Sequence, residues 1–127
     1  QQDRVDWQPL SEQAIALVLA QNKRVFVDVT ADWCITCKAN KFNVLLRDDV
    51  QQALSAPDVV ALRGDWSRPS NTIASFLRQR GSVAIPFNQI YGPGLTDGEI
   101  LSPLLDRSTL LATLAQAGIA PSQGETK

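Results

Sequence analysis

The chain has 127 residues, of which 44% are apolar and 20% are charged, which suits one globular domain with a single buried core. Twelve basic and 13 acidic residues give a net charge of -1, so nothing indicates a nucleic-acid-binding or anionic-membrane-binding surface. No run approaches the roughly 18 apolar residues of a spanning helix and no signal peptide opens the chain, so we expect a soluble polypeptide that does not span the membrane. It begins with Gln1 and contains no methionine, so we expect a processed protein or a piece of a longer one.

The first half of the chain alternates between strand and helix patterns. Apolar residues recur at helical spacing after Ser11, whereas residues 24–30 carry Val and Phe on both faces, as a strand in the middle of a sheet does. In chain order we expect an extended segment at 5–8, a helix capped by Ser11 and ended by Asn22 and Lys23, a strand at 24–30, a helix from Cys34 through Phe42, a break at 46–48 and a further turn at 49–54.

The second half continues the alternation and ends in a helix. We expect a strand at 59–65, a turn at 68–70, a helix at 72–80 that Ser70 can cap, a strand at 86–91, a connection containing Gly92 to Gly94 and Asp97-Gly98, a short strand at 99–101, and a helix from Asp106 or Ser108 through Ala117. The predicted order is β-α-β-α-β-α-β-β-α, an α/β domain with a central mixed sheet flanked by helices. We expect this domain to span residues 1–119, with residues 120–127 forming a flexible C-terminal tail.

The only two cysteines, Cys34 and Cys37, lie directly after the strand at 24–30 and at the start of a predicted helix. Unpaired helix N–H groups and the positive end of the helix dipole favour the thiolate of the first cysteine. The second cysteine lies one helical turn on, so the pair can cycle between dithiol and disulfide through a mixed disulfide with another protein. The motif therefore predicts a thiol-disulfide exchange site.

Other chemistries of such a pair fit this sequence less well. Structural zinc needs four ligands, and the chain has no histidine and no further cysteine. Haem attachment needs His directly after Cys37, where Lys38 stands. A structural disulfide would close too small a loop to constrain the unfolded chain much. We therefore expect no metal and no cofactor, with a Cu(I)-binding module as an alternative because thiolates suit soft metals.

The element order, the Trp-Cys-x-x-Cys-Lys motif at 33–38 and a lone proline at position 86 resemble the thioredoxin fold. This resemblance covers residues 7–117. More narrowly, residues 27–38 and 48–54 resemble the C-terminal periplasmic domain of DsbD-type transmembrane thiol reductases. The stretch Val-Thr-Ala-Asp-Trp-Cys-Ile-Thr-Cys-Lys-Ala-Asn-Lys is most similar to ScsB, the copper-sensitivity-suppressor branch of that group.

The resemblance implies a role for each residue around the cysteine pair. Cys34 would be the exposed nucleophile that forms the mixed disulfide, and Cys37 the buried thiol that resolves it. Asp28 would be the buried carboxylate beneath the pair, with a raised pKa that lets it take the proton from Cys37. Pro86 would be a cis-proline facing the disulfide, with Ile85 offering backbone groups to an extended partner strand. The alternatives are a surface-directed Asp28 and a trans Pro86 that starts an edge strand.

The chain departs from the family pattern in its charges. DsbD-type domains carry a second acidic residue about one turn beyond the cysteines, where this chain has Lys41. A cation there, like Lys38 beside the pair, would favour the thiolate, unless it is simply solvated. The lysine that many thioredoxins place on the third strand is absent, because its position is close to Ala61. Whether Lys41 or Arg63 compensates is open.

Two tryptophans stand near the predicted site. Trp33 precedes Cys34 and would shield the pair and offer a partner an apolar contact, unless it packs in the core. Trp66 follows the strand at 59–65 and matches no family role. We expect partner specificity to be set by the surface loops around Trp33, residues 67–71 and Ile85-Pro86.

The direction of electron flow follows from the residues between the cysteines and from the resemblance. Ile35-Thr36 lacks the Pro-His that accompanies strong oxidants, which favours a reductant. The resemblance implies a domain that takes electrons from the transmembrane thiol-transfer domain of its parent protein and passes them to a periplasmic thioredoxin-like domain or protein. It would lie on the periplasmic side of the bacterial inner membrane, where the absence of other cysteines avoids stray disulfides. An oxidase or isomerase of the same fold is the alternative.

Overall fold

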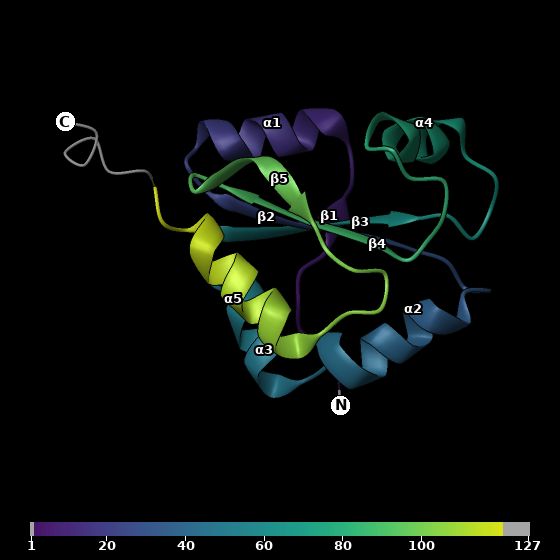
Figure 1. Cartoon of the computed structure of the whole chain (residues 1–127), viewed down its shortest axis with the longest axis horizontal. Coiled ribbons are helices and arrows are strands. Elements are labelled where there is room, and N and C mark those ends of the chain that lie inside the picture. Colours follow the sequence, from purple (N-terminus) through teal and green to yellow (C-terminus); the bar gives the residue numbers. More distant parts are fainter. Residues whose placement is uncertain (1, 121–127) are drawn as a thin grey trace.

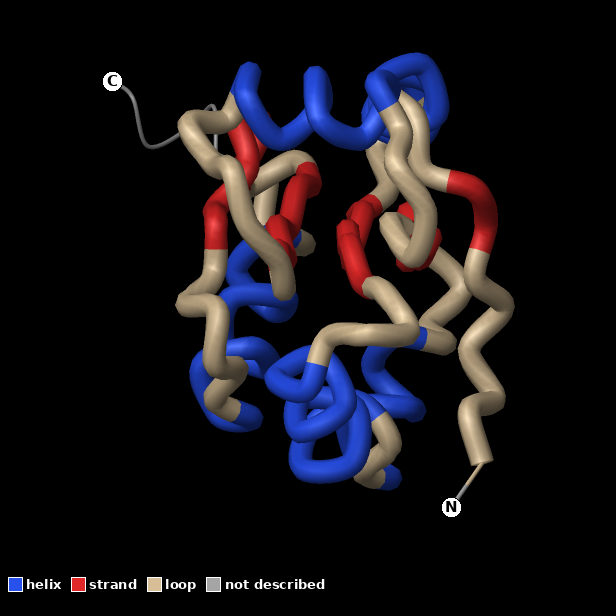
Figure 2. The backbone as a smooth tube through the Cα atoms, turned by 90° about the vertical axis from the view of Figure 1, so that its right-hand side faces the viewer, coloured by secondary structure: helices blue, strands red, loops and turns tan. Residues whose placement is uncertain are grey.

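The computed structural model describes residues 2–120 as three layers, with helices on both faces of a central sheet (Figures 1 and 2). The strands are β1 (Gln8–Pro9), β2 (Arg24–Thr30), β3 (Val59–Asp65), β4 (Phe87–Gly92) and β5 (Leu95–Ile100). The helices are α1 (Glu12–Ala20), α2 (Ile35–Asn40), α3 (Asp48–Leu54), α4 (Asn71–Gln79) and α5 (Arg107–Ala117), and α2 continues into a π-helical segment, η1 (Lys41–Leu45). Most of the predicted tail, residues 121–127, lies outside the described residues.

The sheet is mixed, as the sequence predicts. Its strand order is β1-β3-β2-β4-β5, with β1 and β2 parallel to β3, and with β4 antiparallel to both β2 and β5. Because β2 lies in the middle and is covered on both faces, it needs apolar residues at successive positions, which explains its dense run of Val and Phe. The extended segment predicted at 5–8 pairs with β3 only from Gln8 onward.

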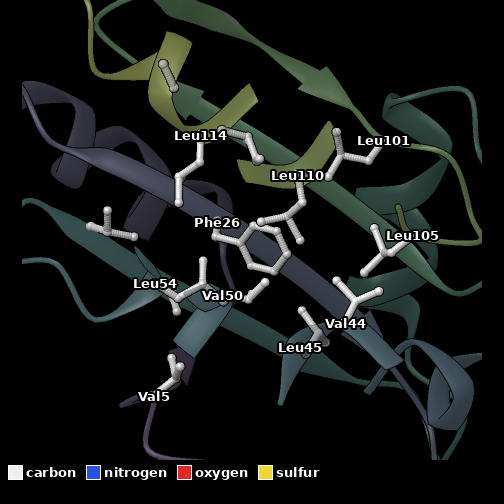
Figure 3. Close-up of a cluster of buried hydrophobic side chains, with 14 residues drawn as sticks. Val5, Phe26, Val44, Leu45, Val50, Leu54, Leu101, Leu105, Leu110 and Leu114 are labelled. Carbon is white, nitrogen blue, oxygen red and sulfur yellow. The ribbon is translucent and has the colours of Figure 1, made fainter. Parts of the chain in front are cut away.

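Alternating residues of β2 belong to two different cores. Val25, Val27 and Val29 lie in the cluster with residues of α1 and α4. Phe26 points the opposite way and lies at the centre of a second cluster built from the strands, η1, α3 and α5 (Figure 3). Asp28 follows Phe26 by two residues and therefore faces the same layer, the one that contains α2.

The helix starts follow their capping residues. Ser11 Oγ accepts a hydrogen bond from the Ala14 N–H at 2.9 Å, and Ser70 Oγ accepts one from Ile73 at 3.2 Å. Of the two candidates for the last helix, Asp106 is the cap, since its carboxylate accepts from Thr109 N–H at 2.9 Å. No helix within residues 2–120 combines the length and apolar character that crossing a bilayer requires.

The predicted break after the cysteine helix is confirmed, while the π-helical segment that precedes it was not expected. The π-helical segment η1 ends at Leu45 with Leu46 as its C-cap, and α3 begins at Asp48. The buried Gln51 side chain donates to the Leu45 carbonyl at 2.9 Å, which satisfies a backbone group that the break leaves without a helical partner. A second side chain, Asn40, connects the helix to the segment after β5 through bonds to Pro103 and Leu105.

The last hairpin differs from the prediction. The connection is only the turn at 93–94, and β5 runs through Asp97-Gly98, which we expected to form part of the loop. Gly98 has φ +82° and lies within β5 at a register shift, where Thr96, Asp97 and Gly98 face only Tyr91 of β4; a Cβ atom at Gly98 would come within 2.6 Å of the Tyr91 ring. The Asp-Gly pair therefore accommodates a β-bulge instead of a turn.

Candidate active site

The cysteine pair lies where β2 leaves the sheet and α2 begins. Cys34 is the N-cap of α2, and its Sγ accepts a hydrogen bond from the Cys37 N–H at 3.1 Å. The two cysteines form a disulfide with their Cα atoms 5.2 Å apart. A helix N–H directed at Sγ stabilises negative charge there, so the local geometry favours a thiolate at Cys34 once the disulfide is reduced.

The predicted contrast in exposure between the cysteines is wrong for this disulfide form. Cys34 is 6% exposed and Cys37 is 7% exposed. With Ala31 they form a small buried cluster, and Trp66 and Ile85, which are far away in the sequence, pack against it. Cys34 differs from Cys37 in its place at the N-cap and in the hydrogen bond that its Sγ accepts from the Cys37 N–H. Its role as nucleophile, and that of Cys37 as resolving thiol, stay predictions.

Asp28 is buried below the pair, so the surface-directed alternative is excluded. The residue is 4% exposed and lines a cavity of about 270 Å³ together with Cys37 and Pro86. Burial raises the pKa of Asp28, as the sequence predicts, and both the Arg63 charge and a hydrogen bond from Asn88 oppose that rise. A carboxyl group that shares a cavity with Cys37 can act as the proton acceptor of the resolving thiol.

The cation beside Asp28 is Arg63, which answers the question that the sequence left open. Arg63 Nε donates to Asp28 Oδ2 at 2.8 Å, and strand register places the two residues opposite each other. Ala61, at the position where many thioredoxins have lysine, is part of the hydrophobic core. Lys38 and Lys41 are exposed and line the same cavity, so their influence on the cysteines stays a prediction.

The Ile85–Pro86 peptide bond is cis, so the trans alternative is wrong. Pro86 is buried and lines the cavity with Cys37, while Ile85 is half-buried and packs against the cysteine cluster. This places the two residues next to the disulfide, as expected. Their contact with a partner strand stays a prediction.

The two tryptophans border an open apolar groove beside the disulfide. Trp33 is 61% exposed and is therefore not a core residue. It lines a groove of about 500 Å³ together with Trp66, Val83 and Ile85. The sequence analysis gave Trp66 no role. However, Trp66 directly follows β3, and the carboxyl ends of adjacent parallel strands meet at one edge of a sheet, so its position in the sequence could have placed it near the cysteines that follow β2. The backbone N–H of Trp66 donates to the carbonyl of Thr30, the last residue of β2, at 2.7 Å.

The arrangement supports thiol-disulfide exchange. It joins two sulfurs within bonding distance, a backbone donor to the first sulfur and a buried carboxyl group in the cavity of the second. Among residues 2–120, no group of three or more His, Cys, Asp or Glu side chains is placed to hold a metal ion.

Comparison with known proteins gives consistent matches. The family described as thioredoxin-like matches residues 6–93. The thiol:disulfide interchange protein DsbD of Yersinia enterocolitica is 32% identical over 71 residues, which are 56% of this chain but only 12% of that protein. A thioredoxin from Thermus thermophilus has a TM-score of 0.66 at 23% identity, covering 88% of this chain and 85% of its own. The reduced DsbD C-terminal domain of Neisseria meningitidis has a TM-score of 0.64 at 22% identity, covering 84% and 92%.

Proposed function

Because this chain belongs to the thioredoxin-like family and is a thiol-disulfide oxidoreductase, we propose that it serves as one link in a reductive relay of the DsbD type. It would accept electrons from the membrane-embedded cysteine pair of a parent protein and pass them to a periplasmic thioredoxin-like domain or protein. The sequence of residues 29–41 favours the ScsB branch, which connects the relay to copper tolerance. The identity to DsbD over 71 residues supports the relay, although the chain spans 12% of that protein's length.

The observation that carries this proposal is the hydrogen bond from the Cys37 N–H to Cys34 Sγ at the start of α2. It stabilises a thiolate on the sulfur that would attack, which makes exchange with another protein's disulfide fast. An apolar contact surface for that protein lies beside the pair and is formed by Trp33, Ile35 and Ile85.

The reduced domain would act in two balanced steps. The Cys34 thiolate attacks one sulfur of the partner disulfide, which forms a mixed disulfide and releases the other partner sulfur as a thiolate. Cys37 then loses its proton to Asp28 and attacks Cys34 Sγ, which breaks the mixed disulfide. The domain ends as the Cys34–Cys37 disulfide, and two electrons have passed to the partner, whose two sulfurs leave as thiolates and take up protons from water while Asp28 gives up the proton that it accepted. The upstream donor repeats these steps to reduce the domain again.

Two serine variants test the roles of the sulfurs. Cys34→Ser should abolish reduction of a protein disulfide, because no nucleophile remains at the helix start. Cys37→Ser should accumulate a mixed disulfide through Cys34, which non-reducing electrophoresis and mass spectrometry detect. If Cys34→Ser still reduced the disulfide, or if Cys37→Ser trapped no partner, the assignment would be wrong.

The reduction potential tests the direction of flow. We expect a value near or below about -230 mV, measured by equilibration in a dithiothreitol or glutathione series and followed by thiol alkylation. A value between about -180 and -120 mV would instead place the domain among oxidases or isomerases. Tight Cu(I) binding combined with slow exchange would favour a copper-binding module.

A further inference from the structure

Three neighbouring strands place three polar side chains in one row below the cysteine pair. In the strand register, Asp28 of β2 lies opposite Arg63 of β3 and opposite Asn88 of β4. Arg63 Nε donates to Asp28 Oδ2 at 2.8 Å, and Asn88 Nδ2 donates to Asp28 Oδ1 at 2.8 Å. Each carboxyl oxygen thus accepts a hydrogen bond from a different strand, an arrangement that suits a carboxylate better than a neutral acid.

The Asn88 amide is held in one orientation. Its Nδ2 also donates to the Val27 carbonyl oxygen at 3.2 Å, and the residue is 1% exposed. Turning the amide over would place its oxygen against both that carbonyl and Asp28, with the loss of two hydrogen bonds. In the observed orientation, Asn88 Oδ1 accepts no hydrogen bond from any described residue. A buried polar atom is left unsatisfied so that the NH₂ group can face Asp28.

Arg63 is held from its other side by the N-terminal segment. Its guanidinium carbon lies 3.7 Å from the centroid of the Trp7 ring, and Nη1 lies 3.6 Å from Asp3 Oδ2. The Trp7 indole N–H donates to the same Asp3 oxygen at 2.8 Å, which fixes both groups around the guanidinium. Stacking and ion pairing leave Arg63 little freedom to turn away from Asp28.

We propose that Arg63 and Asn88 are positioning residues that set the pH range in which Asp28 exchanges a proton with the cysteine pair. This inference rests on the proposed function in its use of Asp28 as proton acceptor. The ionisable groups nearest to Asp28 are Arg63, Asp3 and Cys37. The same cavity is also lined by Asp32, Lys38, Lys41 and Asp65. Among residues 2–120, only Arg63 and Asn88 donate hydrogen bonds to the carboxyl group of Asp28.

The physical reason is a balance between burial and donors. Burial raises the pKa of Asp28, and the charge of Arg63 and the two hydrogen bonds limit that rise. Without them a larger fraction of Asp28 would already hold a proton at a given pH. It could then accept none from Cys37, and resolution of the mixed disulfide would slow until the pH was raised.

The test is a titration of the Asp28 carboxyl group by carbon NMR in the oxidised protein, where the cysteines form the disulfide and do not titrate. Arg63→Gln should raise the Asp28 midpoint by at least about one pH unit, the smallest effect expected for loss of an adjacent opposite charge. Asn88→Leu, a substitution of similar shape, should raise the midpoint by less because it removes a neutral donor. Arg63→Lys should have an Asp28 midpoint close to that of the unsubstituted protein, because lysine restores the positive charge.

The matched control is Arg24→Gln, which removes another partly buried arginine, ion-paired with Asp58 at the opposite end of β2. It should leave the Asp28 midpoint unchanged. An unchanged midpoint in folded Arg63→Gln, or an equal shift in Arg24→Gln, would overturn the proposal. If Arg63→Gln does not fold, Asn88→Leu decides, and an unchanged Asp28 midpoint in that variant would overturn the proposal.

The pH profile of disulfide reduction, with oxidised glutathione as the substrate of the reduced domain, is a separate readout. It should move upward in Arg63→Gln together with the Asp28 midpoint. A shifted midpoint with an unmoved profile would support the positioning role of Arg63 and contradict Asp28 as the proton acceptor. The titration needs no exchange activity, so the two failures are distinguishable.

Discussion

Arg80 contacts residues of α1, α4 and β4, and its substitution by alanine should lower the free energy of unfolding measurably. The residue follows α4 directly and precedes the loop that leads to the cis Pro86. Its guanidinium donates to both oxygens of Glu12 at 2.6 and 2.7 Å, to Gln89 Oε1 at 2.8 Å and to Tyr91 Oη at 2.9 Å. It also lies 3.6 Å from the centroid of the Phe76 ring.

How much stability is lost in Arg80→Ala depends on which of these contacts are shielded from water. The Glu12 side chain is 49% exposed, so the ion pair contributes only about 0–1 kcal/mol despite its short distances. Gln89 and Tyr91 are buried, and losing a charged donor to such groups costs about 1.5–3 kcal/mol. The cation–π contact with Phe76 adds about 0.5–2 kcal/mol. The buried contacts dominate, and we expect Arg80→Ala to lower the free energy of unfolding by about 3 kcal/mol.

The assay is urea denaturation of the oxidised protein, comparing midpoints at an unchanged slope. Arg78→Ala is the matched control, because Arg78 is an exposed arginine near the end of α4, and we expect it to change stability by less than about 0.5 kcal/mol. Arg80→Lys keeps the charge but loses the forked geometry of the guanidinium, so its loss of stability should lie between those of Arg80→Ala and Arg78→Ala. Equal midpoints for Arg80→Ala and Arg78→Ala would refute this account of the contacts.

Three further predictions follow from single positions. Trp33→Ala should change the free energy of unfolding by less than about 0.5 kcal/mol, since Trp33 is 61% exposed. It should slow reduction of a protein disulfide about tenfold but leave the reduction rate of a small-molecule disulfide unchanged. An equal loss of rate with both substrates would contradict a docking role. Gly98→Ala should cost about 2–4 kcal/mol by denaturation, through its positive φ and a clash with Tyr91, whereas Gly81→Ala, with a similar φ and open space, should cost only about 1–2. Because the folded pKa of Asp28 is raised above 3.8, stability should fall as pH rises from there through that pKa, with a slope of up to about 1.4 kcal/mol per pH unit. Asp28→Asn should lack this slope, and identical stability profiles in the two proteins would contradict the assignment.

Local rules were enough to predict most of the fold. The bounds of β2 and β3 match the prediction, because a buried strand needs a continuous apolar run and such runs are visible in one sequence. Ser11 and Ser70 begin helices because a hydroxyl next to an apolar periodic segment satisfies free N–H groups. These signals lie within a few residues of the structure they specify.

The errors arose where a distant segment decides the conformation. Asp97-Gly98 has the composition of a turn, but pairing of β5 with β4 places it inside β5, among the residues that form the irregularity opposite Ile90/Gly92. Cys34 was expected to be exposed because the motif places it at a helix start. Its burial depends on Trp66 and Ile85, which arrive from two other loops and could not be placed without the fold.

The cation beside Asp28 shows why motif comparison and strand register lead to different residues. The family position on β3 is Ala61, which pairs with Phe26 and belongs to the core, whereas the residue opposite Asp28 is Arg63, two positions on and on the same face. At this register the guanidinium lies next to the N-terminal segment, where Trp7 can stack on it. The environment of the buried carboxyl group therefore depends on residues that no cysteine motif contains. A domain lacking residues 1–7 could keep every predicted catalytic residue and still have a different Asp28 midpoint, because Arg63 would lose the groups that direct it.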